Sequence, residues 1–87
     1  MKYQIEIERS ALKNLKKIPA IDRNKVIRSI EKLALNPRPV GSKKLTGREG
    51  WRIRIGNYRV IYEIRELKCY ILVLDIDHRK DIYYLRG

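Results

Sequence analysis

The chain has 87 residues, of which 44% are hydrophobic, and its 21 Lys and Arg against 10 Asp and Glu give a net charge of +11. This length fits one small domain spanning 1–87, and this hydrophobic content is typical of a globular chain rather than a disordered one. An excess of positive charge this large adds self-repulsion to the folded state and favours a polyanionic partner, with nucleic acid ahead of a membrane.

The N-terminal stretch predicts a strand over residues 2–8, because apolar and polar side chains alternate along it. The strand could lie at the edge or in the centre of a sheet. A signal peptide would need a continuous apolar run, and no stretch approaches the roughly 20 apolar residues that span a bilayer. We therefore expect a cytoplasmic protein without membrane contact.

Two helices are predicted next. Ser10 is the expected N-cap of a helix over 11–18, which Pro19 ends, and Asp22 is the expected N-cap of a second helix, which ends before Pro37. Because about three residues join them, the two helices predict an antiparallel helical hairpin. Apolar residues that recur at helical spacing predict its buried side: Ala11, Leu12, Leu15, Ile18, Val26, Ile27, Ile30, Leu33 and Ala34.

Residues 36–50 are rich in Pro and Gly and predict a loop within the domain. The loop carries the cations Arg38, Lys43, Lys44 and Arg48, and residues 38–54 together hold six cations and one acid. Such a run can be a solvated loop. Because it leads directly into further arginines, we expect these four residues to help bind nucleic acid.

Residues 51–64 predict a β-hairpin, since two runs of β-branched and aromatic residues flank Gly56-Asn57. With these two residues as the loop, Arg54 faces Arg59, and Trp51 faces Tyr62 at the far end. Side chains alternate between the faces of a strand, so one face is a core face. Its predicted members are Trp51, Ile53, Ile55, Tyr58, Val60, Tyr62 and Ile64.

The other face of this hairpin holds Arg52, Arg54 and Arg59. Like charges opposite one another destabilise a sheet, so folding alone does not call for this arrangement. Guanidinium groups bind phosphate oxygens in a bidentate manner, and an anion would relieve the repulsion. The arginines predict a phosphate-binding face, against the alternative that they extend into water.

After a turn over 65–68, residues 69–76 are almost continuously apolar and predict a central strand buried on both faces. Cys69, the only cysteine, is expected to be a buried structural thiol. Residues 77–81 predict a turn and 82–85 a short closing strand. The order gives an α+β fold: an N-terminal strand, an antiparallel helical hairpin, and a three- to four-stranded mainly antiparallel sheet with one open, concave, basic face.

RNA cleavage is the chemistry that this composition could support. The RNA 2′-hydroxyl attacks the adjacent phosphate once a group removes its proton, another stabilises the added charge and a third protonates the leaving oxygen. Arginines can stabilise the charge, and His78 or a tyrosine can transfer protons; the alternative for His78 is a solvated turn residue. One His and one Cys exclude a zinc site, and no metal or other cofactor is expected.

Several segments together resemble the RelE/ParE superfamily of toxins from type II toxin–antitoxin systems, and more closely its RelE-like mRNA interferase branch. The similarity covers nearly the whole chain. The segments that carry it are Ala11 with Lys13 and Leu15, Asn36-Pro37-Arg38-Pro39, Lys43-Lys44-Leu45, Trp51-Arg52-Ile53-Arg54, Gly56-Asn57-Tyr58-Arg59-Val60-Ile61-Tyr62-Glu63 and His78-Arg79-Lys80-Asp81-Ile82-Tyr83.

The resemblance implies a toxin that enters the ribosomal A site and cuts mRNA there without a metal. It implies a catalytic set of Arg52, Arg54, Arg59, Arg79, Tyr83 and His78, with Tyr84 as the alternative to Tyr83 and as a ring that stacks on RNA. Its partners would be the ribosome, mRNA and a small acidic RelB-like antitoxin. The alternatives are a ParE-like gyrase inhibitor without nuclease activity and a non-catalytic RNA-binding module.

Overall fold

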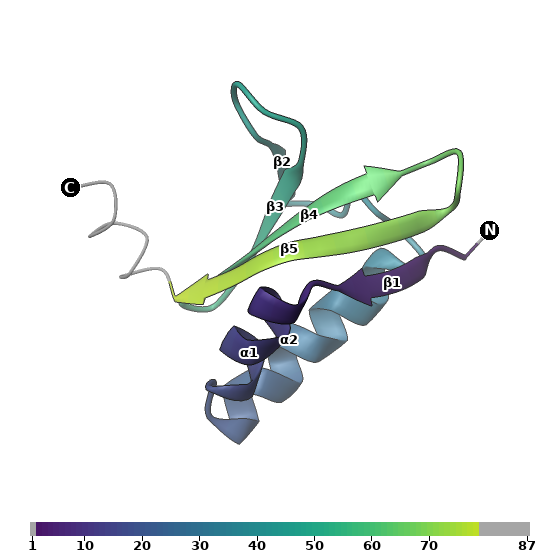
Figure 1. Ribbon diagram of the computed structural model, residues 1–87. Helices are drawn as coiled ribbons and strands as arrows, with labels where there is room; N and C mark the ends of the chain where they lie inside the picture. The colour runs from purple at the N-terminus through teal and green to yellow at the C-terminus, as the bar shows by residue number, and fades with distance from the viewer. Residues whose placement is uncertain (1, 79–87) are drawn as a thin grey trace.

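The computed structural model describes residues 2–78, so the strand predicted at 82–85 lies outside the described residues. Its elements are β1 (Gln4–Ile7), α1 (Arg9–Lys16), α2 (Ala20–Leu33), β2 (Lys43–Lys44), β3 (Trp51–Ile55), β4 (Tyr58–Arg65) and β5 (Tyr70–His78). The strands form one sheet in the order β1-β5-β4-β3-β2, antiparallel except for the parallel pair β1–β5. Both helices cover the same face of this sheet (Figure 1). The predicted α+β fold is confirmed.

The central hairpin has the predicted register, with Arg54 opposite Arg59 and Trp51 opposite Tyr62. Gly56 has φ of 58°, a conformation that glycine adopts without the strain that a side chain would add, whereas Asn57 has a negative φ. A positive φ at the first loop residue alone fits a primed turn with glycine in first position. The local turn chemistry therefore sets the pairing that places the arginines.

The strand pair β4–β5 contains a β-bulge that the sequence did not predict. Ile61 pairs with Asp75, but Tyr62 pairs with Val73, so Leu74 is an extra residue on β5. The bulge changes the phase of the alternation along β5. Before it, Ile71 and Val73 face the helices, and after it the even-numbered residues do. Because the alternation shifts at Leu74, the sequence of β5 is almost continuously apolar, although only its helix-facing side is fully buried.

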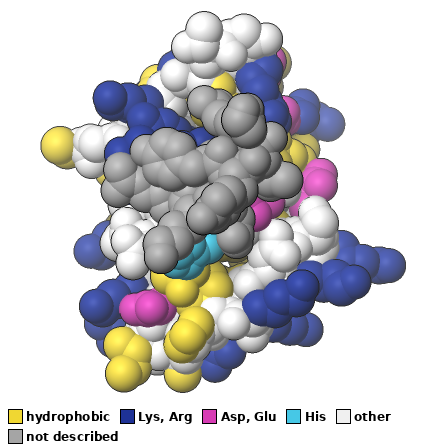
Figure 2. All heavy atoms as spheres, turned by 90° about the vertical axis from the view of Figure 1, so that its left-hand side faces the viewer, with side chains coloured by type: hydrophobic (Ala, Val, Ile, Leu, Met, Phe, Trp, Pro, Cys, Tyr) yellow, Lys and Arg dark blue, Asp and Glu magenta, His cyan; other side chains and the backbone are white. Residues whose placement is uncertain are grey.

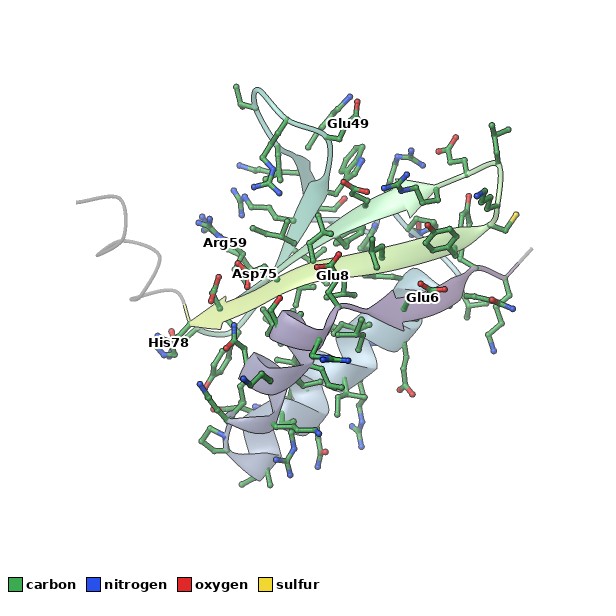
Figure 3. All side chains as sticks on the ribbon, viewed as in Figure 1. Glu6, Glu8, Glu49, Arg59, Asp75 and His78 are labelled. Carbon is green, nitrogen blue, oxygen red and sulfur yellow. The ribbon has the colours of Figure 1, made fainter. Side chains whose placement is uncertain are left out.

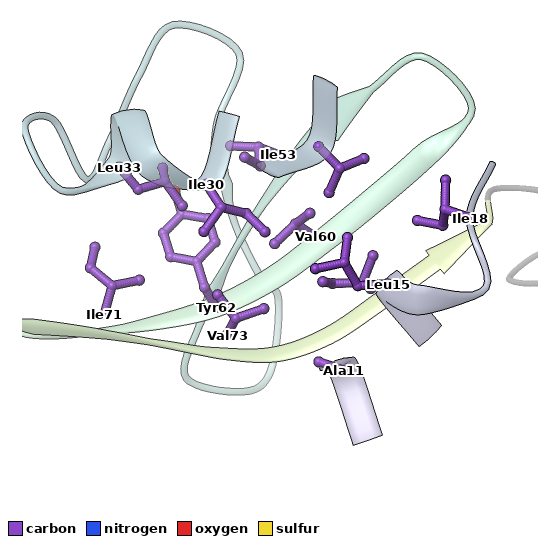
Figure 4. Packing of buried hydrophobic residues seen from close by; sticks show 12 residues of the cluster. Ala11, Leu15, Ile18, Ile30, Leu33, Ile53, Val60, Tyr62, Ile71 and Val73 are labelled. Atoms are coloured by element: carbon purple, nitrogen blue, oxygen red, sulfur yellow. The ribbon is translucent and has the colours of Figure 1, made fainter. Parts of the chain in front are cut away.

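The core lies between the helices and this face of the sheet (Figure 4). α1 packs on β5 and α2 on β3. The apolar stripes predicted for both helices are buried, except that Ile27 is half-buried and Leu12 is 37% exposed. Side chains with at most 7% exposure form the cluster: Ala11, Leu15, Ile18, Val26, Ile30, Leu33, Ile53, Val60, Tyr62, Ile71, Val73 and Ile76.

Both predicted helix caps are wrong. α1 begins before Ser10 because the strand runs directly into it: the backbone N–H of Glu8 donates to the Val73 carbonyl at 2.9 Å, and Glu8 is the N-cap. α2 has Pro19 as its N-cap, and Asp22 lies in its first turn, where a negative charge interacts favourably with the helix dipole. Neither helix, nor any other within residues 2–78, is long and apolar enough to cross a membrane.

Two further predictions about turns need correction. The 36–50 loop contains the short strand β2, which pairs Lys43 with Arg52 and Lys44 with Trp51. Cys69 lies in the turn before β5, with φ of 52° and a half-buried side chain, rather than inside a buried strand. Side-chain patterns do not indicate that backbone pairing includes Lys43 and Lys44, or that it begins only after Cys69.

Candidate functional site

The face of the sheet away from the helices carries a block of four cations, Lys43, Arg52, Arg54 and Arg59, which we call the arginine face. Sheet register places them there: Lys43 pairs with Arg52, and Arg54 with Arg59, in two adjacent rows on the same side. Lys43 and Arg54 are exposed, whereas Arg52 and Arg59 are half-buried. The three neighbouring strands β2, β3 and β4 therefore present one positively charged surface.

Arg59 is the best-positioned member of the arginine face. Its neighbours in the row are Arg54 on β3 and Asp77 on β5. The Nε atom of Arg59 is buried, and Figure 3 shows the guanidinium directed away from the helices. A half-buried arginine loses less side-chain entropy on meeting a phosphate than one that moves freely in water.

The prediction that the whole open face is basic is wrong. On β5 and β1 it carries carboxylates, because Asp75 and Asp77 pair with Ile61 and Arg59, and Glu6 pairs with Leu72. Figure 3 shows Glu6, Glu8, Asp75 and Arg59 on this side. The face is therefore cationic over β2, β3 and the start of β4, and anionic over β5 and β1.

These carboxylates are the residues that sequence reasoning missed. The sequence predicts Asp77 in a turn, but it belongs to β5 and lies beside Arg59 in the register. The only signal for this in the sequence is the polar position at 75 and 77 within an apolar run. The bulge at Leu74 sets which face those positions take, and no local pattern marks that bulge.

His78 does not join the arginine face. It pairs with Tyr58, a core-face residue, and its ring stands edge-on to the Tyr58 ring at 5.1 Å between centroids and 89° between planes. Figure 3 shows it directed to the helix side. Together with Asn14 and Lys17 these rings line a hollow of about 290 Å³ at the end of α1.

The loop cations divide between two places. Lys43 belongs to the arginine face, but Lys44 pairs with Trp51 and so faces the opposite side. Arg38 lies over the Trp51 ring, with Cζ 5.1 Å from its centroid, and its Nη2 is 2.5 Å from Oε1 of Glu66. Arg48 is exposed in the loop that follows β2.

Arg38 and Lys44 instead line a separate hollow of about 420 Å³ at the edge of the sheet, with Glu49, Trp51 and Glu63 among its walls. The expected single basic surface is therefore incorrect for these two residues. A cation–π contact of this kind is worth about 0.5–1 kcal/mol at an exposed site, so Arg38 has a structural role whether or not it meets RNA.

Arg79, Tyr83 and Tyr84, the other three predicted site residues, lie outside the described residues. Within residues 2–78, no group of three or more His, Cys, Asp and Glu side chains is arranged to hold a metal ion. What the described part of the face offers is three guanidinium groups beside a carboxylate. The guanidinium groups can bind a phosphate and stabilise negative charge on it, and the carboxylate can accept a proton.

Comparisons with known proteins show which family this chain resembles in sequence and fold. A family model described as the ParE toxin of the type II toxin–antitoxin system parDE matches residues 5–83. The chain is 36% identical over 87 residues to the candidate toxin RelE1 of Methanocaldococcus jannaschii, an alignment covering 95% of this chain and 97% of that protein.

Two solved structures of antitoxin-bound toxins have the same fold. The RelE–RelB complex of Pyrococcus horikoshii matches with a TM-score of 0.81 and 27% identity, over 91% of this chain and 97% of that one. The RelB–RelE complex of Methanococcus jannaschii matches with a TM-score of 0.72 and 28% identity, over 88% and 93% of the two chains.

Proposed function

The chain belongs to the ParE toxin family of type II toxin–antitoxin systems and is RelE-like, and from this premise we propose that it is an endoribonuclease that cuts mRNA in the ribosomal A site. The observation that carries the proposal is the pair Arg54 and Arg59, opposite each other with Arg52 alongside, on a face that the helices leave uncovered. A fold that needed only stability would not place like charges directly opposite one another.

In the proposed reaction the substrate supplies its own nucleophile. The 2′-oxygen of the RNA bonds to the adjacent phosphorus while the bond from phosphorus to the 5′-oxygen breaks, which leaves a cyclic phosphate and a free 5′-hydroxyl. Arg52, Arg54 and Arg59 donate to the phosphate oxygens as negative charge builds there. Donors already in place for the transition state contribute most to such catalysis.

Two proton transfers complete the reaction. Asp77 is the carboxylate beside Arg59 in the sheet register, and we assign it the proton of the 2′-hydroxyl. Resemblance to the RelE branch supports Tyr83, with Tyr84 as its alternative, as the group that serves the leaving 5′-oxygen or stacks on a base, and Arg79 as a further phosphate ligand. His78 has no part in this proposal because its ring packs on Tyr58 at the opposite face.

Neighbouring cations would extend the RNA path. Lys43 lies on the arginine face, and Arg48 is exposed close to it in sequence. Their proposed role is sequence-independent contact with phosphates, which positions the strand for cleavage. Arg38 and Lys44 lie outside this path.

The proposed partner is a small antitoxin. The chains that match this one in two solved structures are bound to RelB proteins. A net charge of +11 favours an antitoxin segment that is acidic where it crosses this surface. An antitoxin bound over the arginine face would prevent RNA from reaching it.

The proposal is tested by primer extension on a reporter mRNA in a cell-free translation mix, with the wild type and Arg59→Ala. We expect ribosome-dependent cuts within codons, and at least a hundredfold fewer with Arg59→Ala, since removing one donor to a developing charge typically lowers the rate by about 10²–10³. The matched control is Lys68→Ala, which removes an exposed cation from the turn before β5.

Wild-type protein that leaves the mRNA uncut while cell growth still stops would refute the nuclease. A second candidate, a gyrase inhibitor without nuclease activity, is favoured by the match to a family model named for ParE. In that case a supercoiling assay would show inhibition by both the wild type and Arg59→Ala.

A further inference from the structure

The outer surface of the two helices holds a second concentration of positive charge that the proposed nuclease does not use. We call it the helix surface. Among the residues of α1 and α2 with the C-cap Lys17, only Glu31 is an exposed acid, and Asp22 is half-buried. The exposed cations are Arg9, Lys13, Lys16, Lys17, Lys25, Arg28 and Lys32.

These cations form two stripes. In α1, Lys13 follows Arg9 by four residues, and Lys16 and Lys17 follow Lys13 by three and four. In α2, Arg28 follows Lys25 by three residues, and Lys32 follows Arg28 by four. Such spacings place side chains on one side of a helix, over roughly 10 Å of its length. Like charges at these spacings destabilise a helix by a few tenths of a kcal/mol each. Folding is therefore not the reason for the stripes.

The fold does not neutralise the helix surface. The ion pairs Arg38–Glu66 and Arg65–Glu63 of the described residues involve no residue of either helix. Figure 2 shows dark-blue Lys and Arg side chains along both flanks of the helical part of the molecule. The arginine face lies on the opposite side of the sheet, so one ligand on the sheet cannot neutralise both.

The chemistry of the helix surface favours a phosphate backbone over other polyanions. A membrane-binding helix needs a continuous free apolar side, and here most apolar residues of both helices are buried against the sheet, which leaves only Leu12 and Ile21 as exposed large apolar residues of α1 and α2. A protein interface usually needs aromatic anchors, and neither α1 nor α2 contains Phe, Trp or Tyr. Dispersed Lys and Arg on a rigid scaffold are what backbone binding to a nucleic acid requires.

We propose that the helix surface binds the phosphate backbone of duplex RNA, while the arginine face holds the single strand to be cut. The surface itself goes beyond the proposed nuclease and does not depend on it. The choice of RNA as the nucleic acid rests on that function. Because the two surfaces lie on opposite faces, both can be occupied at once.

The test compares two double variants that each lower the net charge by two. Lys13→Gln/Arg28→Gln removes one cation from each stripe, and the control Lys2→Gln/Lys68→Gln removes exposed cations outside both surfaces. Fluorescence anisotropy with a labelled, blunt-ended RNA duplex of about 16 base pairs, a length that a small domain can span, gives the affinity in a series of salt concentrations. Circular dichroism checks that both variants fold.

The helix variant should bind about tenfold or more weakly at ~0.15 M salt, with a log–log salt slope smaller by about 1.8, which is two contacts at about 0.9 each. The control should change the affinity less than twofold. Equal weakening in both variants, which net charge alone would cause, overturns the proposal. So does an unchanged duplex affinity of the helix variant, including the case in which that variant loses binding to the antitoxin instead.

Arg59→Ala separates this inference from the proposed nuclease. Its duplex affinity should equal that of the wild type, and equal weakening with Lys13→Gln/Arg28→Gln would place the duplex on the arginine face and refute the inference. Failure of mRNA cleavage in the wild type leaves the duplex result intact. Each proposal can therefore fail alone.

Discussion

Tyr62 links the core to the loop that precedes the site. Its side chain is fully buried, and its hydroxyl donates to the Pro37 carbonyl at 2.6 Å. Burial raises the pKa of Tyr62 to about 12, although a side-chain hydrogen bond with Ser42 and the charge of Arg38 act in the opposite direction. The neutral phenol is therefore part of the folded structure, and one buried hydroxyl fixes the path of the chain after α2.

A pH dependence of stability follows from Tyr62. Because folding raises the pKa above its ordinary value of 10, the contribution of the neutral phenol is complete below pH 10 and is lost as the pH rises to about 12. At most about 3 kcal/mol is at stake for two pKa units. Urea unfolding at several pH values should show a steeper loss of stability above pH 10 for the wild type than for Tyr62→Phe. Parallel curves for the two proteins would contradict this assignment.

At the scale of elements, the β3–β4 hairpin is where the sequence was most informative. Gly56-Asn57 identified the turn, the alternation identified the core face, and together they determined all five pairs of the register. The arginine face follows from this register without any tertiary information. Local chemistry was sufficient because a two-residue loop leaves only one way to align the strands.

Replacing Arg54 should separate stability from activity. Arg54→Thr removes the like-charge pair with Arg59 and introduces a residue that suits a strand, so the free energy of unfolding should rise by up to about 1 kcal/mol at low salt. Cleavage in the primer-extension assay should fall.

Urea unfolding measures the first effect, and Lys44→Thr is its control, since Lys44 is an exposed strand residue paired with Trp51. A loss of stability in Arg54→Thr would show that the two arginines do not repel each other in the folded protein.

Elements that depend on distant pairing were not predictable. β2 exists because two residues of a loop meet the start of β3, and α1 starts early because Glu8 still bonds to β5. The face taken by His78 and Asp77 depends on the bulge at Leu74, 17 residues after Asn57 in the hairpin turn, where local patterns carry no signal. Sequence reasoning thus places the three arginines on one face and misses the carboxylate beside Arg59.

At the scale of the whole molecule, the charge is arranged in three regions. The arginine face and the helix surface are cationic, and the β5–β1 side of the open face carries Glu6, Asp75 and Asp77. An RNA strand on the open face would be repelled from β5 and β1 and held over β3 and β4. The net charge of +11 does not indicate this division, which follows from the order of the strands in the sheet.

The same charge should control the encounter with the proposed antitoxin. We expect the association rate constant with an acidic antitoxin to fall at least tenfold between about 0.05 and 0.5 M salt, since steering by exposed charges is screened over about 10 Å at 0.1 M. Stopped-flow mixing measures this rate. The dissociation rate should change less, and a rate of association independent of salt would exclude electrostatic steering.

The extra residue Leu74 affects the shape of the sheet rather than the pairing of its residues. The residues on either side of the bulge pair with neighbours on β4 that are adjacent in sequence, so a β5 without Leu74 could keep every partner in a regular ladder. What such a strand would lose is the added right-handed twist that a bulge brings. The extra residue thus sets the angle at which the Arg59–Asp77 end of the sheet is turned from the end at Ile64 and Ile71. The direction in which a bound strand leaves the protein would depend on that angle.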